Sequence, residues 1–93
     1  MAWYVYILRC RDGSLYTGCT DNVERRLGVH QSGRGAKYTR SRLPVALAYE
    51  EEAGDKSAAL RREAAIKRLT REQKLKLIGT YPAETDGAGE EIP

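Results

Sequence analysis

The sequence predicts a small α+β domain in which three strands and three helices follow in the order strand, strand, helix, strand, helix, helix. Two runs of aromatic and β-branched residues near the start are separated by an Asp-Gly pair, and a third apolar run follows Pro44. Three other segments begin after helix-capping residues, and the two longer ones have apolar residues at helical spacing. The 93 residues suffice for one hydrophobic core.

The first two strands are expected at residues 3–10 and 14–19. Residues 11–13 (Arg-Asp-Gly) fit a three-residue hairpin loop, in which a type I turn is closed by a left-handed glycine. The two strands should therefore pair as an antiparallel hairpin.

This loop length fixes the pairing of the hairpin. It sets Tyr6 opposite Gly18 and Leu8 opposite Tyr16, so Tyr4, Tyr6 and Tyr16 share one face of the sheet. A two-residue turn would instead separate Tyr6 from Tyr16, because a shift of one residue changes the face of every side chain.

The two cysteines are not expected to form a disulfide. Cys10 and Cys19 fall on opposite faces of the hairpin, and one histidine with two cysteines lacks the paired spacing of a zinc site.

No window is long and apolar enough for a membrane span. Arg9 and Arg11 follow the first apolar run, whereas a signal peptide has its basic residues before it. We expect a cytoplasmic protein.

Charge is distributed unevenly along the chain. Residues 1–79 contain all 16 basic side chains and nine of the acidic ones, a net charge of +7. Residues 80–93 contain only acidic charges, together with glycine and proline. We therefore expect one domain over residues 1–79 and a disordered acidic tail over residues 80–93. The basic domain suits a polyanionic partner, although charge alone does not identify one.

A first helix is expected over residues 21–31. Asp21 is the predicted cap, and an acidic residue three positions later completes a capping-box pattern. At the angular spacing of an α-helix, Arg26 and His30 lie within about 60° of the apolar stripe, whereas Arg25 points almost the opposite way. Arg26 should therefore be the inward arginine of the pair.

The following segment, residues 32–43, is predicted to be an extended loop. It has four positive charges, two glycines, one aromatic side chain (Tyr38) and no acid. The Tyr38 ring is suited to stacking on a base, but an aromatic side chain that closes the core would look the same in the sequence. After Pro44, residues 45–50 predict the third strand.

Two helices are expected to complete the domain, over residues 56–69 and 70–78. Asp55 or Ser57 can cap the first of them. The predicted inward arc of that helix is formed by Ala59, Leu60, Ala64 and Ile66. Glu63 lies in the middle of this arc, where a carboxylate without a partner is costly to bury. An internal ion pair with Arg26 would explain its position.

A set of residues in this order is similar to the motifs of a known family. The set is Tyr4-Val5-Tyr6, Tyr16-Thr17-Gly18, Arg26, His30 and Glu63. It resembles the GIY-YIG nuclease superfamily over about residues 3–78, and residues 33–38 are similar to its small stand-alone bacterial members. Tyr4 stands where the family has glycine and Thr17 where it has isoleucine. We expect no appended DNA-binding domain of the kind that many members carry, so the substrate is not predicted.

The resemblance implies a small three-stranded antiparallel sheet flanked by helices, in a β-β-α-β-α-α order. It also implies an endonuclease that hydrolyses DNA phosphodiester bonds with a divalent metal, Mg²⁺ or Mn²⁺, and a place in DNA repair or recombination.

The same resemblance assigns roles to five residues. Tyr6 would take a proton from water, which requires a pKa well below its usual value of about 10. Tyr16 would orient water or phosphate, and Arg26 would bind the scissile phosphate. Glu63 would hold the metal, and His30 would relay a proton or contact phosphate.

Simpler explanations exist for each of these residues taken alone. Tyr6 and Tyr16 are also typical of sheet packing, and His30 of a partly buried helix residue with a local partner. The basic loop supplies the candidate nucleic-acid contacts, which are Arg34, Lys37, Tyr38, Arg40 and Arg42. Two alternatives to an enzyme remain open. One is a nucleic-acid-binding module that does not turn over, and the other is an adaptor that uses its acidic tail.

Overall fold

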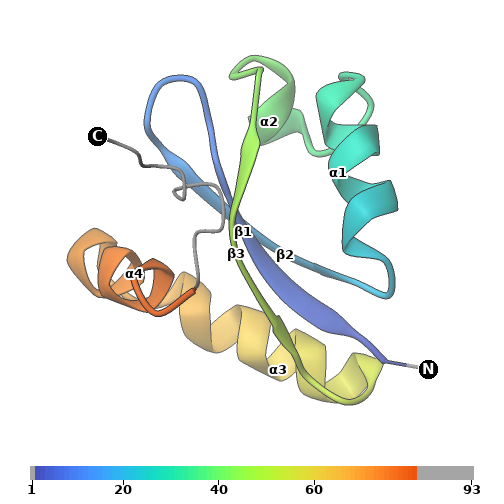
Figure 1. The fold of residues 1–93 in the computed structure, drawn as a ribbon, viewed down its shortest axis with the longest axis vertical. Helices are drawn as coiled ribbons and strands as arrows, with labels where there is room; N and C mark the ends of the chain where they lie inside the picture. Colours follow the sequence, from blue (N-terminus) through green and yellow to red (C-terminus); the bar gives the residue numbers. More distant parts are fainter. Residues whose placement is uncertain (1, 82–93) are drawn as a thin grey trace, which may run out of the picture.

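A three-stranded antiparallel sheet lies between two groups of helices in the computed structural model, which describes residues 2–81 (Figure 1). The elements are β1 (Tyr4–Arg9), β2 (Leu15–Thr20), α1 (Val23–Gln31), α2 (Lys37–Arg40), β3 (Ala46–Glu52), α3 (Lys56–Lys67) and α4 (Arg71–Ile78). The predicted α+β class and the order of the six predicted elements are confirmed. Residues 82–93 of the expected tail lie outside the described residues, so the domain boundary stays a prediction.

The hairpin of β1 and β2 has the predicted three-residue loop. The backbone N–H of Cys10 donates to the carbonyl of Ser14 at 2.9 Å, and Gly13 adopts a left-handed φ of 86°. Tyr6 is paired with Gly18 and Leu8 with Tyr16. The expected sharing of one sheet face by the tyrosines follows from this register.

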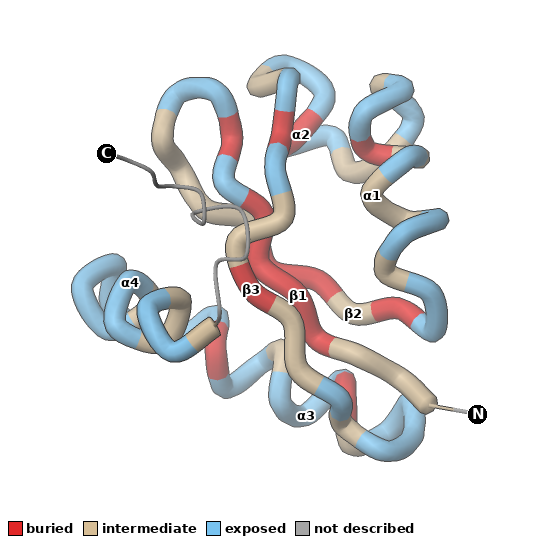
Figure 2. The backbone as a smooth tube through the Cα atoms, viewed as in Figure 1, coloured by how far each residue is buried: buried red, intermediate tan, exposed pale blue. Residues whose placement is uncertain are grey.

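Each face of the sheet has its own hydrophobic cluster, and the buried residues concentrate on the strands (Figure 2). On one face, Val5 and Ile7 pack against Ala59 and Ile66 of α3. On the other face, Tyr6 and Leu8 belong to a cluster against which Tyr16, Leu27, Leu43 and Leu47 pack. Cys10 and Cys19 are both free and fall in different clusters, as the alternation along the strands requires.

The central strand is β1, and β2 and β3 are its two neighbours. The pairing of β1 with β3 contains a bulge, so that Ile7 is opposite Tyr49 while Leu8 is opposite Leu47. The extra residue places Tyr49 and Leu47 on opposite faces, although they are two apart in sequence. One strand therefore contributes to both cores.

The cap predicted for α1 is wrong by one residue. Asn22, and not Asp21, has extended backbone angles, and its side chain accepts a hydrogen bond from the backbone N–H of Arg25 at 2.9 Å. Asp21 instead forms an exposed ion pair with Arg25 at 2.8 Å. Both residue types are good caps, so backbone geometry decides between them.

The prediction of an extended loop over residues 32–43 is also wrong in part, because Lys37–Arg40 forms the short helix α2. Its N-cap, Ala36, provides no side-chain hydrogen bond. Four residues are too few to show a helical repeat, and the helix is fixed by a tertiary contact of the buried Thr39.

The caps of α3 and α4 agree with their sequences. Asp55 caps α3, which settles the choice between Asp55 and Ser57, and Thr70 forms a full capping box with Gln73 at the start of α4. Only half of the predicted inward arc of α3 is correct. Ala59 and Ile66 are buried, whereas Leu60 is 48% exposed. Ala64 is exposed as well, because α3 rests on the sheet by its other side. Within residues 2–81, no helix has the length and apolar character needed to span a membrane.

Candidate active site at the edge of the sheet

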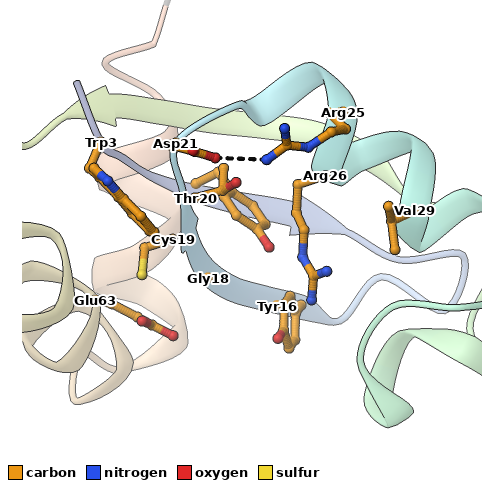
Figure 3. A pocket seen from close by; sticks show the side chains of 11 residues that line it. Trp3, Tyr16, Gly18, Cys19, Thr20, Asp21, Arg25, Arg26, Val29 and Glu63 are labelled. Atoms are coloured by element: carbon orange, nitrogen blue, oxygen red, sulfur yellow. Dashed lines mark hydrogen bonds and ion pairs between the residues drawn. The ribbon is translucent and has the colours of Figure 1, made fainter. Parts of the chain in front are cut away.

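A pocket of about 360 Å³ lies beside the edge strand β2. It is lined by Trp3, Tyr6, Tyr16, Gly18, Cys19, Thr20, Asp21, Arg25, Arg26, Val29 and Glu63. Figure 3 shows Arg26 extending into the pocket from α1 and Glu63 from α3 on the opposite side, with Gly18 between them. Four of the five predicted catalytic residues therefore share one pocket. The fifth, His30, lies directly behind Tyr6.

Gly18 keeps the pocket open next to Tyr6. A Cβ atom at Gly18 would lie 2.5 Å from the Tyr6 hydroxyl oxygen, which is closer than two such atoms can approach. The missing side chain thus leaves room for the phenol at the strand edge. Gly18 needs no positive φ, so its role here is one of space.

The Tyr6 hydroxyl is 3.0 Å from Nε2 of His30, and both residues are buried. Nδ1 of His30 is in turn 3.0 Å from the hydroxyl of Thr39. The Thr39 hydroxyl also donates to the carbonyl oxygen of Ala36 at 2.9 Å. A continuous chain of hydrogen bonds therefore leads from the pocket through α1 to α2.

Tyr6 and His30, the two titratable groups in this series of hydrogen bonds, are both neutral near pH 7. Burial raises the pKa of Tyr6 to about 12, although a hydrogen bond and the charge of Arg26 act to lower it. Burial, with the nearby charge of Arg26, lowers the pKa of His30 below its usual value. The lowered Tyr6 pKa that its predicted role requires is therefore not present in this state, because desolvation outweighs the single cation.

The orientation predicted for the two neighbouring arginines agrees with the structure. Arg26 is half-buried and points into the pocket, whereas Arg25 is exposed and paired with Asp21. Among residues 2–81, Arg26 forms no ion pair with a carboxylate. Its charge is thus available to an anion in the pocket.

Glu63 reaches the pocket from the other side of the sheet, and its side chain is only 16% exposed. The ion pair with Arg26, the alternative explanation of its position, is not formed. Glu63 is instead paired with Lys67 one turn later, at 2.9 Å between Oε2 and Nζ. Burial and the Glu63 carboxylate raise the pKa of the neighbouring Cys19 thiol to about 11, so this thiol is protonated.

The pocket meets the requirements of one hard divalent cation. Mg²⁺ usually retains several waters and is held by one or two carboxylates together with substrate phosphates. Glu63 supplies such a carboxylate in the pocket, and Asp21 lines the same pocket. No cluster of three or more histidine, cysteine or acidic side chains suited to a metal occurs within the described part of the chain. The donor set therefore fits a hydrated ion and not a fully protein-coordinated one.

The residues predicted to contact nucleic acid lie in α2 and next to it in the sequence. The Tyr38 ring stacks on Tyr16, with 6.1 Å between ring centroids, and remains 38% exposed. The Arg42 guanidinium lies 3.9 Å above the centre of the Tyr38 ring and forms an ion pair with Asp12. Arg42 is therefore engaged within the protein, and Tyr38 packs on Tyr16, while its stacking on a base stays a prediction.

The other cations of this segment face solvent. Arg34, Lys37 and Arg40 are all exposed. Tyr16 and Tyr38 also line a neighbouring hollow together with Lys67 and Lys74.

Several residues of this region were missed by sequence reasoning. They are Gly18, Gly35, Thr39, Lys67 and Lys74. Gly18 belongs to a recognised motif, so that signal was present. Gly35 lies within residues 33–38, a run singled out in the sequence without a role for Gly35. Thr39 belongs to a short helix without a sequence pattern, and the two lysines resemble any solvated helix charge.

Comparison with known proteins agrees with this fold and identifies the family. The model of the GIY-YIG catalytic domain matches residues 2–76, so the chain belongs to the GIY-YIG family of nucleases. A UPF0213 protein of Staphylococcus haemolyticus is 57% identical over 81% of this chain and 92% of its own length. A UPF0213 protein of Clostridium perfringens is 52% identical over 96% of both chains.

Solved structures of similar proteins share the fold. The solution structure of a UPF0213 protein from Bacillus halodurans has a TM-score of 0.60 and 43% identity, and it covers 96% of this chain and 95% of that one. A protein from E. faecalis has a TM-score of 0.56 and 38% identity, over 100% of this chain and 94% of its own.

Proposed function

We propose that this protein is a divalent-metal-dependent endonuclease that hydrolyses DNA phosphodiester bonds. The observation that carries the proposal is the convergence of Tyr6, Arg26 and Glu63 from β1, α1 and α3 on one pocket. Phosphodiester hydrolysis needs a proton acceptor near water, a cation near the phosphate, and an oxygen ligand for a hard metal. The three side chains supply one of each.

The proton path proposed here uses Tyr6 and His30 together. As a water molecule attacks phosphorus, its proton passes to the Tyr6 oxygen, and the original phenol proton passes to Nε2 of His30. The bond from phosphorus to the leaving ester oxygen breaks in the same step, and that oxygen takes a proton from solvent. Tyr6 then never has to exist as a free phenolate, which its pKa of about 12 disfavours. His30 is the final acceptor, and its lowered pKa keeps it unprotonated before the reaction while making it a weaker base.

Arg26 and Tyr16 are proposed to hold the substrate. The guanidinium of Arg26 is permanently charged and can form two hydrogen bonds with phosphate oxygens. Its binding to phosphate would also reduce its repulsion of a protonated His30. The Tyr16 hydroxyl, in the same pocket, would orient water or phosphate.

Glu63 is the proposed ligand of Mg²⁺ or Mn²⁺, whose contribution when bound would be to stabilise negative charge on the phosphate and to acidify water. In the structure Glu63 is paired with Lys67, so Lys67 is expected to move toward a substrate phosphate when the carboxylate is used.

DNA is the proposed polyanion, and the exposed cations indicate where it lies. Arg34, Lys37 and Arg40 are exposed in and next to α2, and Lys67 and Lys74 line the hollow next to Tyr16. The Tyr38 ring is partly exposed, and a base that stacks on it would have to displace the Arg42 guanidinium. Branched, damaged or single-stranded DNA would offer an unpaired base, and we propose a role in DNA repair or recombination in the cytoplasm.

A cleavage assay tests this function. Nicked, branched and single-stranded DNA are incubated with the protein in Mg²⁺, in Mn²⁺ and in excess chelator. We expect cleavage only with metal, and a loss of at least about 100-fold for Glu63→Gln. Glu52→Gln is the matched control, because Glu52 is exposed on β3, which lies on the other side of β1 from β2. Equal rates for the two variants, or no cleavage by the wild type, would contradict the proposal.

A nucleic-acid-binding module without turnover is the second candidate. It is favoured by the raised pKa of Tyr6 and by the ion pair that engages Glu63. It predicts salt-dependent DNA binding in the presence of chelator, weakened by changes of Arg34, Lys37 or Arg40. Fluorescence anisotropy with a labelled oligonucleotide measures this binding. Metal-dependent product formation by the same preparation rules this candidate out.

A further inference from the structure

Thr39 is fully buried and makes two hydrogen bonds of different kinds. Its hydroxyl lies 2.9 Å from the carbonyl oxygen of Ala36, three residues earlier in the chain. The same oxygen lies 3.0 Å from Nδ1 of His30. A bond from threonine to the carbonyl three residues earlier is common. The contact with the histidine of another helix is not explained by such local bonding.

The two contacts together determine where the ring proton of His30 lies. A threonine hydroxyl has one proton, and a carbonyl oxygen can only accept. Thr39 therefore donates to Ala36, because otherwise two oxygens would face each other at 2.9 Å with no proton between them. Its oxygen must then accept a proton from His30, so Nδ1 is the protonated nitrogen. Nε2, which faces Tyr6, is left with a free electron pair.

We propose that Thr39 is a positioning residue that holds His30 in the Nδ1–H tautomer, so that Nε2 accepts the proton of Tyr6. The proposal rests on the proposed function for its catalytic consequence, although the tautomer itself does not depend on it. In the other tautomer Nε2 would carry a proton and could not accept one from Tyr6. The Tyr6 oxygen would then have to donate elsewhere or remain the acceptor.

Gly35 supports the same arrangement by allowing close approach. A Cβ atom at Gly35 would lie 2.3 Å from Nδ1 of His30, so no other residue fits there without moving the ring. The backbone before α2 is thus packed directly against the imidazole. This contact and the Thr39 hydrogen bond restrain the ring from two neighbouring positions of one segment.

The segment around Thr39 also contains exposed cations. Lys37 and Arg40 are exposed, while Thr39 between them is buried against His30. The short helix α2 therefore joins a surface suited to phosphate contact with the hydroxyl that sets the tautomer. A substrate bound to α2 would steady the residue on which the proton path depends.

Nuclear magnetic resonance measures the tautomer directly. His30 is the only histidine in the sequence, so the ring signals of a ¹⁵N-labelled sample need no assignment among several residues. We expect Nδ1 to have the chemical shift of a protonated ring nitrogen and Nε2 that of an unprotonated one. A wild-type spectrum with the opposite pattern would overturn the proposal without any variant.

Variants test the part played by the hydroxyl. Thr39→Val removes it with little change of shape and should give a mixture of tautomers, whereas Thr39→Ser should keep the wild-type signals. Thr17→Val is the matched control, because Thr17 is also buried but its hydroxyl has no hydrogen-bond partner among the described residues. Retention of a pure Nδ1–H tautomer in folded Thr39→Val would overturn the proposal. Wild-type amide signals confirm that each variant is folded.

Cleavage kinetics test the consequence for the reaction. Thr39→Val should lower kcat by about 10- to 100-fold, as outer hydrogen bonds to functional histidines do, with little change in KM for DNA. Thr39→Ser should restore most of the rate. An unchanged kcat in Thr39→Val would overturn the catalytic part. If the wild type shows no cleavage, the proposed function fails, whereas the tautomer measurement still decides the role of Thr39.

Discussion

The Tyr6 hydroxyl lies between a histidine and an arginine, and these neighbours act on it in different ways. Nε2 of His30 lies 3.0 Å from the hydroxyl and is its proposed hydrogen-bond acceptor, while the charge of Arg26 acts to lower the Tyr6 pKa. Burial is the larger influence and raises the pKa to about 12. A phenol in this position is a poor base on its own, but it can accept a proton from water while it donates its own proton to the imidazole. The pair, and not the tyrosine alone, is the proposed acceptor.

The raised pKa of Tyr6 predicts a loss of stability at high pH. Above about pH 10 the unfolded chain loses the phenol proton, whereas the folded protein retains it up to about pH 12. Tyr6 alone should therefore lower the free energy of unfolding by about 1.4 kcal/mol per pH unit within this window. Urea unfolding of the wild type and of Tyr6→Phe across this range measures the difference. Equal slopes of stability against pH in the two proteins would refute the assignment.

Substitution by alanine should have opposite effects on stability at two of the glycines. Gly18→Ala places a methyl group 2.5 Å from the Tyr6 hydroxyl, so the ring must shift, at a cost of about 1–3 kcal/mol in unfolding free energy. Gly28→Ala, in α1, meets no atom within 4 Å and should stabilise by about 0.5–1 kcal/mol. Thermal or urea unfolding compares them. A stable Gly18→Ala that keeps the Tyr6 to His30 hydrogen bond would show that this space is not needed.

At the scale of elements, the sequence predicted best where local chemistry decides the geometry. Gly13 closes the hairpin loop, and the resulting register places Tyr6 opposite Gly18 as expected. The helix α2 was missed because it is held by the burial of Thr39 against His30, a contact between residues nine apart that no local pattern encodes. Neighbouring good caps, Asp21 and Asn22, could not be distinguished without backbone angles.

The corrected cap of α1 predicts unequal effects of two adjacent substitutions. Asn22→Ala removes the hydrogen bond to the Arg25 backbone and should lower the free energy of unfolding by about 1 kcal/mol. Asp21→Ala removes only an exposed ion pair and should cost well under about 1 kcal/mol. Urea unfolding of the two variants measures this. If Asp21→Ala destabilised the protein more than Asn22→Ala does, Asp21 would be the cap.

The candidate site was predictable in part for similar reasons. Helix phase alone separates Arg26 from Arg25, and the structure agrees. An ion pair of Glu63 with Arg26 was one explanation of its position, but its partner is Lys67, because the i,i+4 spacing on α3 brings these two side chains together. The protonation of Tyr6 could not be foreseen, since it depends on the balance of burial against one cation.

At the scale of the whole molecule, the edge strand explains how two faces of one sheet form one site. Arg26 belongs to α1 on one face and Glu63 to α3 on the other, and a sheet normally keeps such helices apart. They meet because β2 is the last strand on its side and has Gly18 beside the pocket. The exposed cations in and around α2 are the surface on which we propose that DNA binds.

The most direct measurement of this convergence is single-turnover cleavage by Arg26→Ala, by Glu63→Gln and by the double variant. Residues that act as one unit have strongly non-additive effects. We expect each single variant to lose at least about 100-fold in rate and the double variant to be little slower than the worse single one. Losses that multiply in the double variant, or a wild type without metal-dependent product, would contradict a single phosphodiesterase site around the edge of β2.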